Sequence, residues 1–262
     1  MLNRTRLLVA TSALALGFAP FAPAVAAPPA GFAGTVSGEY GNVDMGGADA
    51  SSWGANGEAA FGLGPTFGGQ INGGYHNLSG DGGDADIFDV GGSLFWASDM
   101  ARAGGTIAYK SIDLGGGFDV NATGYGAFGE FYLSNFFTIG AHGGGWSGEA
   151  LGFDSDGFYV GGRLTGYVMP NLAISGTLDF LGDDVGGDAT TWGVDAEYQF
   201  SPTMPISIYG GYRNTSFDGG GDLDAFFIGV KFYAGSAPME LVGNHRNGAL
   251  GWLGDPLRGL QF

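Results

Sequence analysis

The sequence predicts an all-β protein, a single antiparallel transmembrane β-barrel of about twelve strands joined as an up-and-down meander. Three observations predict it: extended segments alternate apolar and polar residues, a hairpin pattern repeats along the chain, and the composition is rich in glycine and aromatic residues but poor in charge. The 262 residues include 55 Gly, with 14% aromatic and only 13% charged residues. A soluble domain carries roughly a quarter charged residues. The low charge therefore indicates a surface that faces lipid.

Residues 1–26 have the pattern of a secretory signal peptide. Arg4 and Arg6 precede an apolar run that ends in the small residues Ala24-Val25-Ala26, which form a typical cleavage site. A permanent helical anchor fits less well, because prolines interrupt the run. We therefore expect an exported protein whose mature part begins at residue 27.

The charge balance and the lack of cysteine exclude several classes of partner and site. The chain has 26 acidic and 9 basic residues, a formal net charge of −17. Loss of Arg4 and Arg6 with the signal peptide leaves 7 − 26 = −19. So acidic a chain is not expected to bind nucleic acid. Without cysteine there is no disulfide and no thiolate metal site, so we expect neither a cofactor nor a structural metal.

A descending strand recurs behind acidic, glycine-rich segments. In one copy Trp192 and Val194 form an apolar row, while Gly193 and Asp195 lie between them. A period of two residues is the strand signature, and it excludes a helical solenoid of similar repeat length. The anchoring aromatic residues, spaced 33 to 37 positions apart, are Trp53, Phe88, Tyr125, Phe158, Trp192 and Phe226.

Each descending strand has an ascending partner. The partners are residues 32–40, 67–75, 103–109, 137–145, 172–180 and 206–212. Six pairs give twelve strands of roughly 9 to 13 residues, enough to cross a bilayer at a tilt. Short turns such as Ser134-Asn135 alternate with longer acidic loops such as Asp218–Asp224. This asymmetry predicts short turns and both termini at the periplasmic end, and long loops at the other end.

The final strand carries a resemblance to a known family. It reads Phe226-Phe227-Ile228-Gly229-Val230-Lys231-Phe232-Tyr233. Together with the signal peptide and the alternating strands, it resembles the porin-like outer-membrane β-barrel proteins of Gram-negative bacteria over about residues 32–234. The resemblance implies an outer-membrane location, contact with lipid and lipopolysaccharide, and insertion by the barrel-assembly machinery. That machinery reads a terminal aromatic residue, here Phe232 or Tyr233.

The chain departs from this family after its last strand. The barrel is expected over residues 27–235, and residues 236–262 are expected to form a C-terminal periplasmic tail. Two interpretations of the tail stay open, a flexible extension without a function and a plug or docking segment. Its terminal Phe262 is a second candidate for the assembly signal.

Phasing each strand from its anchor aromatic residue places charged side chains on the face away from lipid. Charge at membrane depth is tolerated where it lines water or is paired, so these residues predict a polar interior. The predicted pore-lining residues are Glu39, Glu58, His76, Lys110, Glu130, His142, Arg163, Asp179, Asp195, Glu197, Arg213 and Lys231.

Two functions fit this interior. The first is a narrow porin-like pore for passive diffusion of small hydrophilic solutes, with a mild cation preference set mainly by the acidic loops. The second is a closed structural or surface-interaction barrel whose acidic loops bind divalent cations, lipopolysaccharide or a protein partner. No catalytic residue and no enzyme activity is expected, since the sequence has neither a Gly-x-Ser-x-Gly nor a His-Glu-x-x-His motif.

Overall fold

The computed structural model describes residues 31–80, 83–116, 119–150, 153–184, 187–201, 204–235 and 240–254. The expected signal peptide and the terminal Phe262 lie outside these ranges, as do residues 236–239 of the tail. The boundaries expected for the signal peptide, the barrel and the tail therefore stay predictions.

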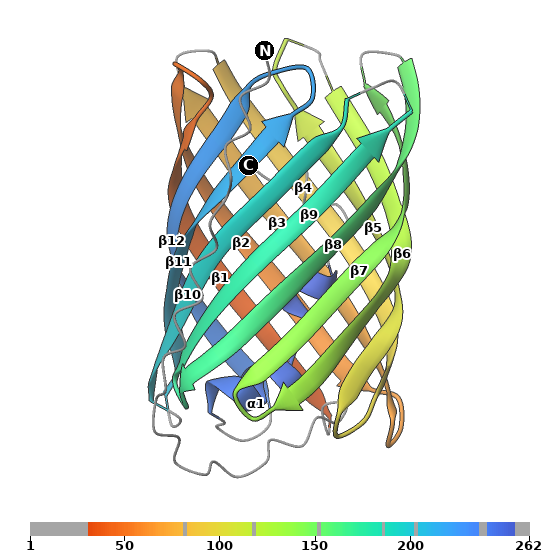
Figure 1. Cartoon of the computed structure of the whole chain (residues 1–262), viewed down its shortest axis with the longest axis vertical. Helices are drawn as coiled ribbons and strands as arrows, with labels where there is room; N and C mark the ends of the chain where they lie inside the picture. Colours follow the sequence, from red (N-terminus) through yellow and green to blue (C-terminus); the bar gives the residue numbers. More distant parts are fainter. Residues whose placement is uncertain are drawn as a thin grey trace, which may run out of the picture.

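Twelve antiparallel strands form one closed barrel. Each strand pairs with the next along the chain, and β1 pairs with β12 to close the cylinder. Figure 1 shows the strands strongly tilted around a common axis. The predicted fold class is confirmed. The strands are β1 Phe32–Asp44, β2 Asp49–Gly62, β3 Phe67–Gly80, β4 Gly83–Ala97, β5 Ala101–Asp113, β6 Asp119–Ser134, β7 Phe137–Ala150, β8 Phe153–Met169, β9 Leu172–Asp183, β10 Ala189–Ser201, β11 Met204–Phe217 and β12 Asp222–Gly235.

The period-two pattern separates an apolar outside from a polar inside. All six anchor aromatic residues point outward, with exposed fractions from 45% at Trp192 to 63% at Phe226. Their neighbours along each strand point inward, because successive side chains of a strand alternate between its faces. The outward position predicted for the anchor residues is confirmed. So large an apolar outer surface is typical of a barrel that faces acyl chains.

Aromatic side chains near the acidic end of the barrel direct their polar atoms toward the strand ends. The Tyr75 hydroxyl donates to an Asp86 carboxylate oxygen at 2.5 Å. The Trp192 indole donates to the Asn214 side chain at 3.0 Å. An apolar ring with a polar tip fits the boundary between hydrocarbon and headgroups, so these residues form one belt of an interfacial girdle.

The strands are longer and the connections shorter than the sequence pattern predicts. Strand lengths run from 12 residues in β9 to 17 in β8, and two (81–82) to five (114–118) residues separate consecutive strands. The predicted longer acidic loops are therefore wrong: Asp222 and Asp224, for example, belong to β12. The acidic residues extend the pairing instead, which satisfies their backbone groups. They form an acidic rim at the strand ends, made of Asp44, Asp49, Asp84, Asp86, Asp113, Asp119, Glu149, Asp154, Asp156, Asp183, Asp222 and Asp224.

The described part of the tail lies inside the barrel. It contains a short helix, α1 Leu241–Asn247, and a 3₁₀ turn, η1 Gly251–Gly254. Figure 1 shows α1 within the ring of strands at one end. That end carries the short turns, because the Leu241 amide donates to the carbonyl of Pro170 between β8 and β9 at 3.0 Å. Of the two interpretations of the tail, residues 240–254 have the plug arrangement. No helix in the described part of the chain is long and apolar enough to span a membrane.

A lipid-facing residue tests which side of the barrel meets the membrane. Ile228 lies near the middle of β12 and is 64% exposed on the outer surface. We expect Ile228→Arg to lower the free energy of unfolding in lipid vesicles by about 2–4 kcal/mol, the cost of a basic side chain at the bilayer midplane. Urea titration measures it, and Ile228→Leu is the matched control. An unchanged stability in Ile228→Arg would contradict the lipid-facing assignment.

Candidate functional site

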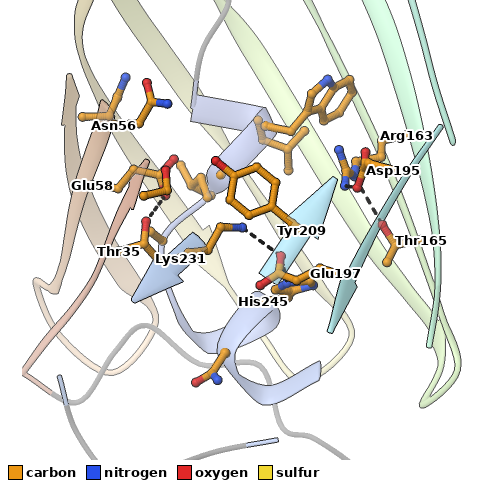
Figure 2. Close-up of a pocket in the computed structure, with 18 of the residues that line it drawn as sticks. Thr35, Asn56, Glu58, Arg163, Thr165, Asp195, Glu197, Tyr209, Lys231 and His245 are labelled. Atoms are coloured by element: carbon orange, nitrogen blue, oxygen red, sulfur yellow. Dashed lines mark hydrogen bonds and ion pairs between the residues drawn. The ribbon is translucent and has the colours of Figure 1, made fainter. Parts of the chain in front are cut away.

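A polar cavity of about 190 Å³ lies inside the barrel. Its wall comes from most of the strands and from the tail segment that contains α1 and η1. Figure 2 shows labelled side chains from several strands, among them Glu58, Arg163 and Lys231, directed into this shared space. The volume and the polar lining suit several ordered water molecules.

The structure places all twelve predicted pore-lining residues on the inner face of their strands. Seven of them line the cavity: Glu39, Glu58, Glu130, Arg163, Asp195, Glu197 and Lys231. The other five do not line it. His142 and Asp179 belong to a second, smaller pocket, His76 and Lys110 are buried, and Arg213 lies over the Phe227 ring at 5.5 Å. That all twelve line a conducting pore stays a prediction.

Most interior charges are paired across neighbouring strands. Lys231 contacts Glu197 at 2.8 Å, and Arg163 contacts Asp195 at 2.7 Å. In the histidine pairs, His142 contacts Asp179 at 2.9 Å and His76 contacts Glu39 at 3.5 Å. Pairing lowers the cost of holding charge away from bulk water, which is why a barrel interior can carry so many ionic groups.

Glu197 has the most printed partners of the interior carboxylates. Besides Lys231 it accepts hydrogen bonds from Ser207 and Tyr233, both at 2.5 Å, and His245 of the tail lies 3.3 Å away. The partners come from β11, β12 and α1, so one buried carboxylate ties two neighbouring strands to the tail. A buried carboxylate is stable only when its oxygens are satisfied in this way.

The cavity wall carries a surplus of negative charge. Glu58 accepts a hydrogen bond from the Thr35 hydroxyl at 3.2 Å, and no ion pair joins Glu58 to a basic side chain of the described residues. The oxygen-bearing side chains of Asn56 and Asn72 line the same region. An excess carboxylate in a confined, low-dielectric space attracts cations. Among the residues that the structure describes, no group of His, Asp or Glu side chains is arranged to hold a metal ion.

Arg102 is an interior residue that the sequence reasoning missed. Its guanidinium contacts Glu130 through Nε at 3.2 Å and through Nη2 at 2.8 Å. The expected ascending strand began at residue 103, one position too late, whereas β5 begins at Ala101. Extending the alternation backward from Lys110 by steps of two reaches Arg102 and would have found it.

The residues of the tail that contact the wall had no sequence signal. Arg246 donates to the Ser134 carbonyl, Asn244 to the Gln199 side chain, and the Leu250 amide to the Gln70 side chain. These contacts join positions up to 180 residues apart. No local periodicity encodes such pairs.

The interior changes character toward the end that carries the acidic rim. There Val43, Leu78, Ile87 and Ile112 form an apolar cluster that is almost completely buried. These residues lie within five positions of the strand ends that carry the rim. The lumen therefore has three levels: an apolar cluster near the rim, the polar cavity, and the tail at the short-turn end.

Solved structures with this architecture are outer-membrane barrels. An outer membrane channel from Pseudomonas putida F1 superposes with a TM-score of 0.56 at 13% sequence identity, covering 82% of this chain and 99% of that one. A KdgM porin in complex with disordered oligogalacturonate superposes with a TM-score of 0.52 at 10% identity, covering 75% of this chain and 98% of that one.

The chain has the fold of a porin-like outer-membrane β-barrel protein. The predicted resemblance is confirmed at the level of the fold. No protein-family model matches the chain, and no curated protein sequence matches it. At such low identities the solute of a similar barrel does not transfer to this one.

The Glu197–Lys231 pair of this porin-like barrel can be tested by a double-mutant cycle. We expect Lys231→Met to lower the free energy of unfolding by about 3 kcal/mol, because it leaves a buried carboxylate without its cation. Adding Glu197→Gln should recover most of the loss, since a neutral amide needs no counter-charge. Urea unfolding in detergent micelles measures both variants. Purely additive losses would show that the two groups do not stabilise one another.

Proposed function

We propose that this protein is a channel of the bacterial outer membrane that admits small hydrophilic solutes by passive diffusion. The observation that carries the proposal is the polar cavity lined by charged side chains inside a barrel whose outside is apolar. Twelve strands enclose more space than the side-chain-filled eight-stranded barrels and less than open sixteen-stranded porins. The chain is therefore suited to a narrow path.

The surroundings of the barrel follow from its surface. The outer apolar band and its girdle suit the acyl chains and headgroups of a membrane, with lipopolysaccharide at the rim side. The signal peptide expected in residues 1–26 would provide export, and the barrel-assembly machinery would insert the chain. In this orientation the short turns and α1 face the periplasm.

A mild cation preference is the second part of the proposal. Glu58 adds negative charge to the cavity that no ion pair of the described residues balances. The acidic rim adds a negative field at one mouth. Both features raise the local concentration of cations relative to anions.

A closed structural or surface-interaction barrel is the alternative, and one arrangement favours it. The tail occupies the lumen at the short-turn end, and the apolar cluster of Val43, Leu78, Ile87 and Ile112 lies near the other end. In this alternative the acidic rim would bind divalent cations, lipopolysaccharide or a protein partner. Deletion of rim residues would then abolish binding and leave permeability unchanged.

Ion conduction in planar lipid bilayers tests the proposal. We expect discrete channel openings with a reversal potential in a salt gradient that indicates cations permeate more readily than anions. Glu58→Gln should shift the reversal potential toward zero, because it removes the carboxylate and keeps the shape of the side chain. Glu149→Gln, at an exposed position of the rim, is the matched control and should have a smaller effect.

Two results would contradict the channel. Correctly folded protein that conducts no ions, with the tail in place or removed, would leave the closed barrel as the function. Conduction with an unchanged reversal potential in Glu58→Gln would reject Glu58 as a determinant of selectivity and leave the channel itself standing.

A further inference from the structure

We infer that residues 240–254, called the plug from here on, are a gate that keeps the channel closed until the plug leaves the barrel. The inference rests on the proposed channel and adds its regulation. It is carried by a set of specific contacts between the plug and the inner wall, and by the way the wall remains satisfied without them.

Arg246 fixes the periplasmic end of the plug. Its guanidinium donates to the Ser134 carbonyl at 2.6 Å, to the Phe137 carbonyl at 3.1 Å and to the Thr138 hydroxyl at 3.1 Å. The guanidinium carbon also lies 4.7 Å from the centre of the Tyr132 ring. With only 2% of its surface exposed, this arginine is held by a built receptor at the turn between β6 and β7. Cation–π contacts and charge-assisted hydrogen bonds are strong where water is excluded.

Arg102 of the wall binds the carboxyl end of α1. It donates to the Gly248 carbonyl at 3.0 Å and to the His245 carbonyl at 3.2 Å. The last carbonyls of a helix have no partner within the helix, so a basic group placed there satisfies them and complements the helix dipole. A helix of only seven residues is not stable alone in water, so α1 depends on this wall for its structure.

The upper part of the plug packs on an apolar patch inside the barrel. Leu250, Trp252 and Leu253 form a buried cluster with Phe95 and Phe128 of the wall. The Trp252 ring also lies 4.4 Å from the His142 ring, measured between centroids. Burial of these side chains supplies the apolar part of the binding free energy.

The wall stays satisfied when the plug leaves, which separates a gate from a permanent core. Arg102 keeps its two contacts with Glu130. Glu197 keeps Lys231 in the same way. The strand ladder closes through β1 and β12 without any residue of the plug. Departure of the plug therefore breaks no strand pairing and strips neither wall charge of its ionic partner.

The opposite holds for the plug itself. Arg246 has its printed partners only in the wall, and it would return to water on release. Release thus costs apolar burial and a few hydrogen bonds, a free energy that a substitution at one anchor can offset. Arg246 is a positioning residue: it holds the plug in the lumen.

The experiment uses the full-length chain, which has no native cysteine. Leu253→Cys places a single reporter thiol at the buried contact between plug and wall. In folded protein in lipid vesicles, we expect a hydrophilic maleimide to label this thiol slowly. Addition of Arg246→Ala should raise the labelling rate and, in planar bilayers, the fraction of time spent open by several-fold. Arg246→Lys, which retains the charge and loses the planar fork, should give an intermediate effect.

Glu240→Gln is the matched control, since Glu240 is exposed and its side chain forms no capping hydrogen bond with α1. It should label and conduct like the parent. Deletion of residues 236–262 is the second variant and should give the largest open fraction, with the barrel verified by its resistance to unfolding in detergent.

The outcomes separate the gate from the channel. Faster labelling of Arg246→Ala without a change in conductance would overturn the gate and leave the channel intact. Equal labelling and conductance in all variants, the deletion included, would also overturn the gate. Faster labelling with no ion conduction by any variant would overturn the proposed channel, and the gate with it.

Discussion

The closed ladder of backbone hydrogen bonds is the constraint on which the rest of this structure depends. In hydrocarbon no water satisfies an amide or a carbonyl, so a strand can cross only when both of its edges are paired. The pairing of β1 with β12 provides the last such edge. Long strands that continue into the acidic segments follow from the same demand, because each additional paired residue leaves fewer backbone groups unsatisfied.

Closure imposes a second problem, since it turns every other side chain toward a confined interior. The chain resolves it in different ways at different depths. Apolar residues pack together near the rim, ion pairs such as Arg163–Asp195 neutralise one another in the middle, and the tail fills the short-turn end. Glycine helps at crowded positions: a Cβ on Gly161 would lie 2.5 Å from His142 Nε2 and still closer to Asp179 Oδ1, so the pair needs an open neighbour.

The interior and the tail are therefore coupled through a small number of polar groups. Arg102 and Glu197 each serve the wall and the plug together, through separate contacts of one side chain. Such shared residues let a barrel hold an internal segment firmly without making its own stability depend on that segment. This coupling connects the architecture to the proposed control of permeation.

The sequence by itself determined the barrel, the strand count and the face on which each charged residue lies. Those features follow from a period of two residues, which is a local property: Phe226 and Lys231 are assigned to opposite faces by their spacing alone. The strand ends were harder to place, because glycine and aspartate disfavour strands locally and only pairing with a neighbour extends them. Only the tertiary structure decided that Arg102 pairs with Glu130 and that Arg246 enters the lumen. Both depend on register around a closed cylinder and on contacts more than a hundred residues apart, which no short window of sequence contains.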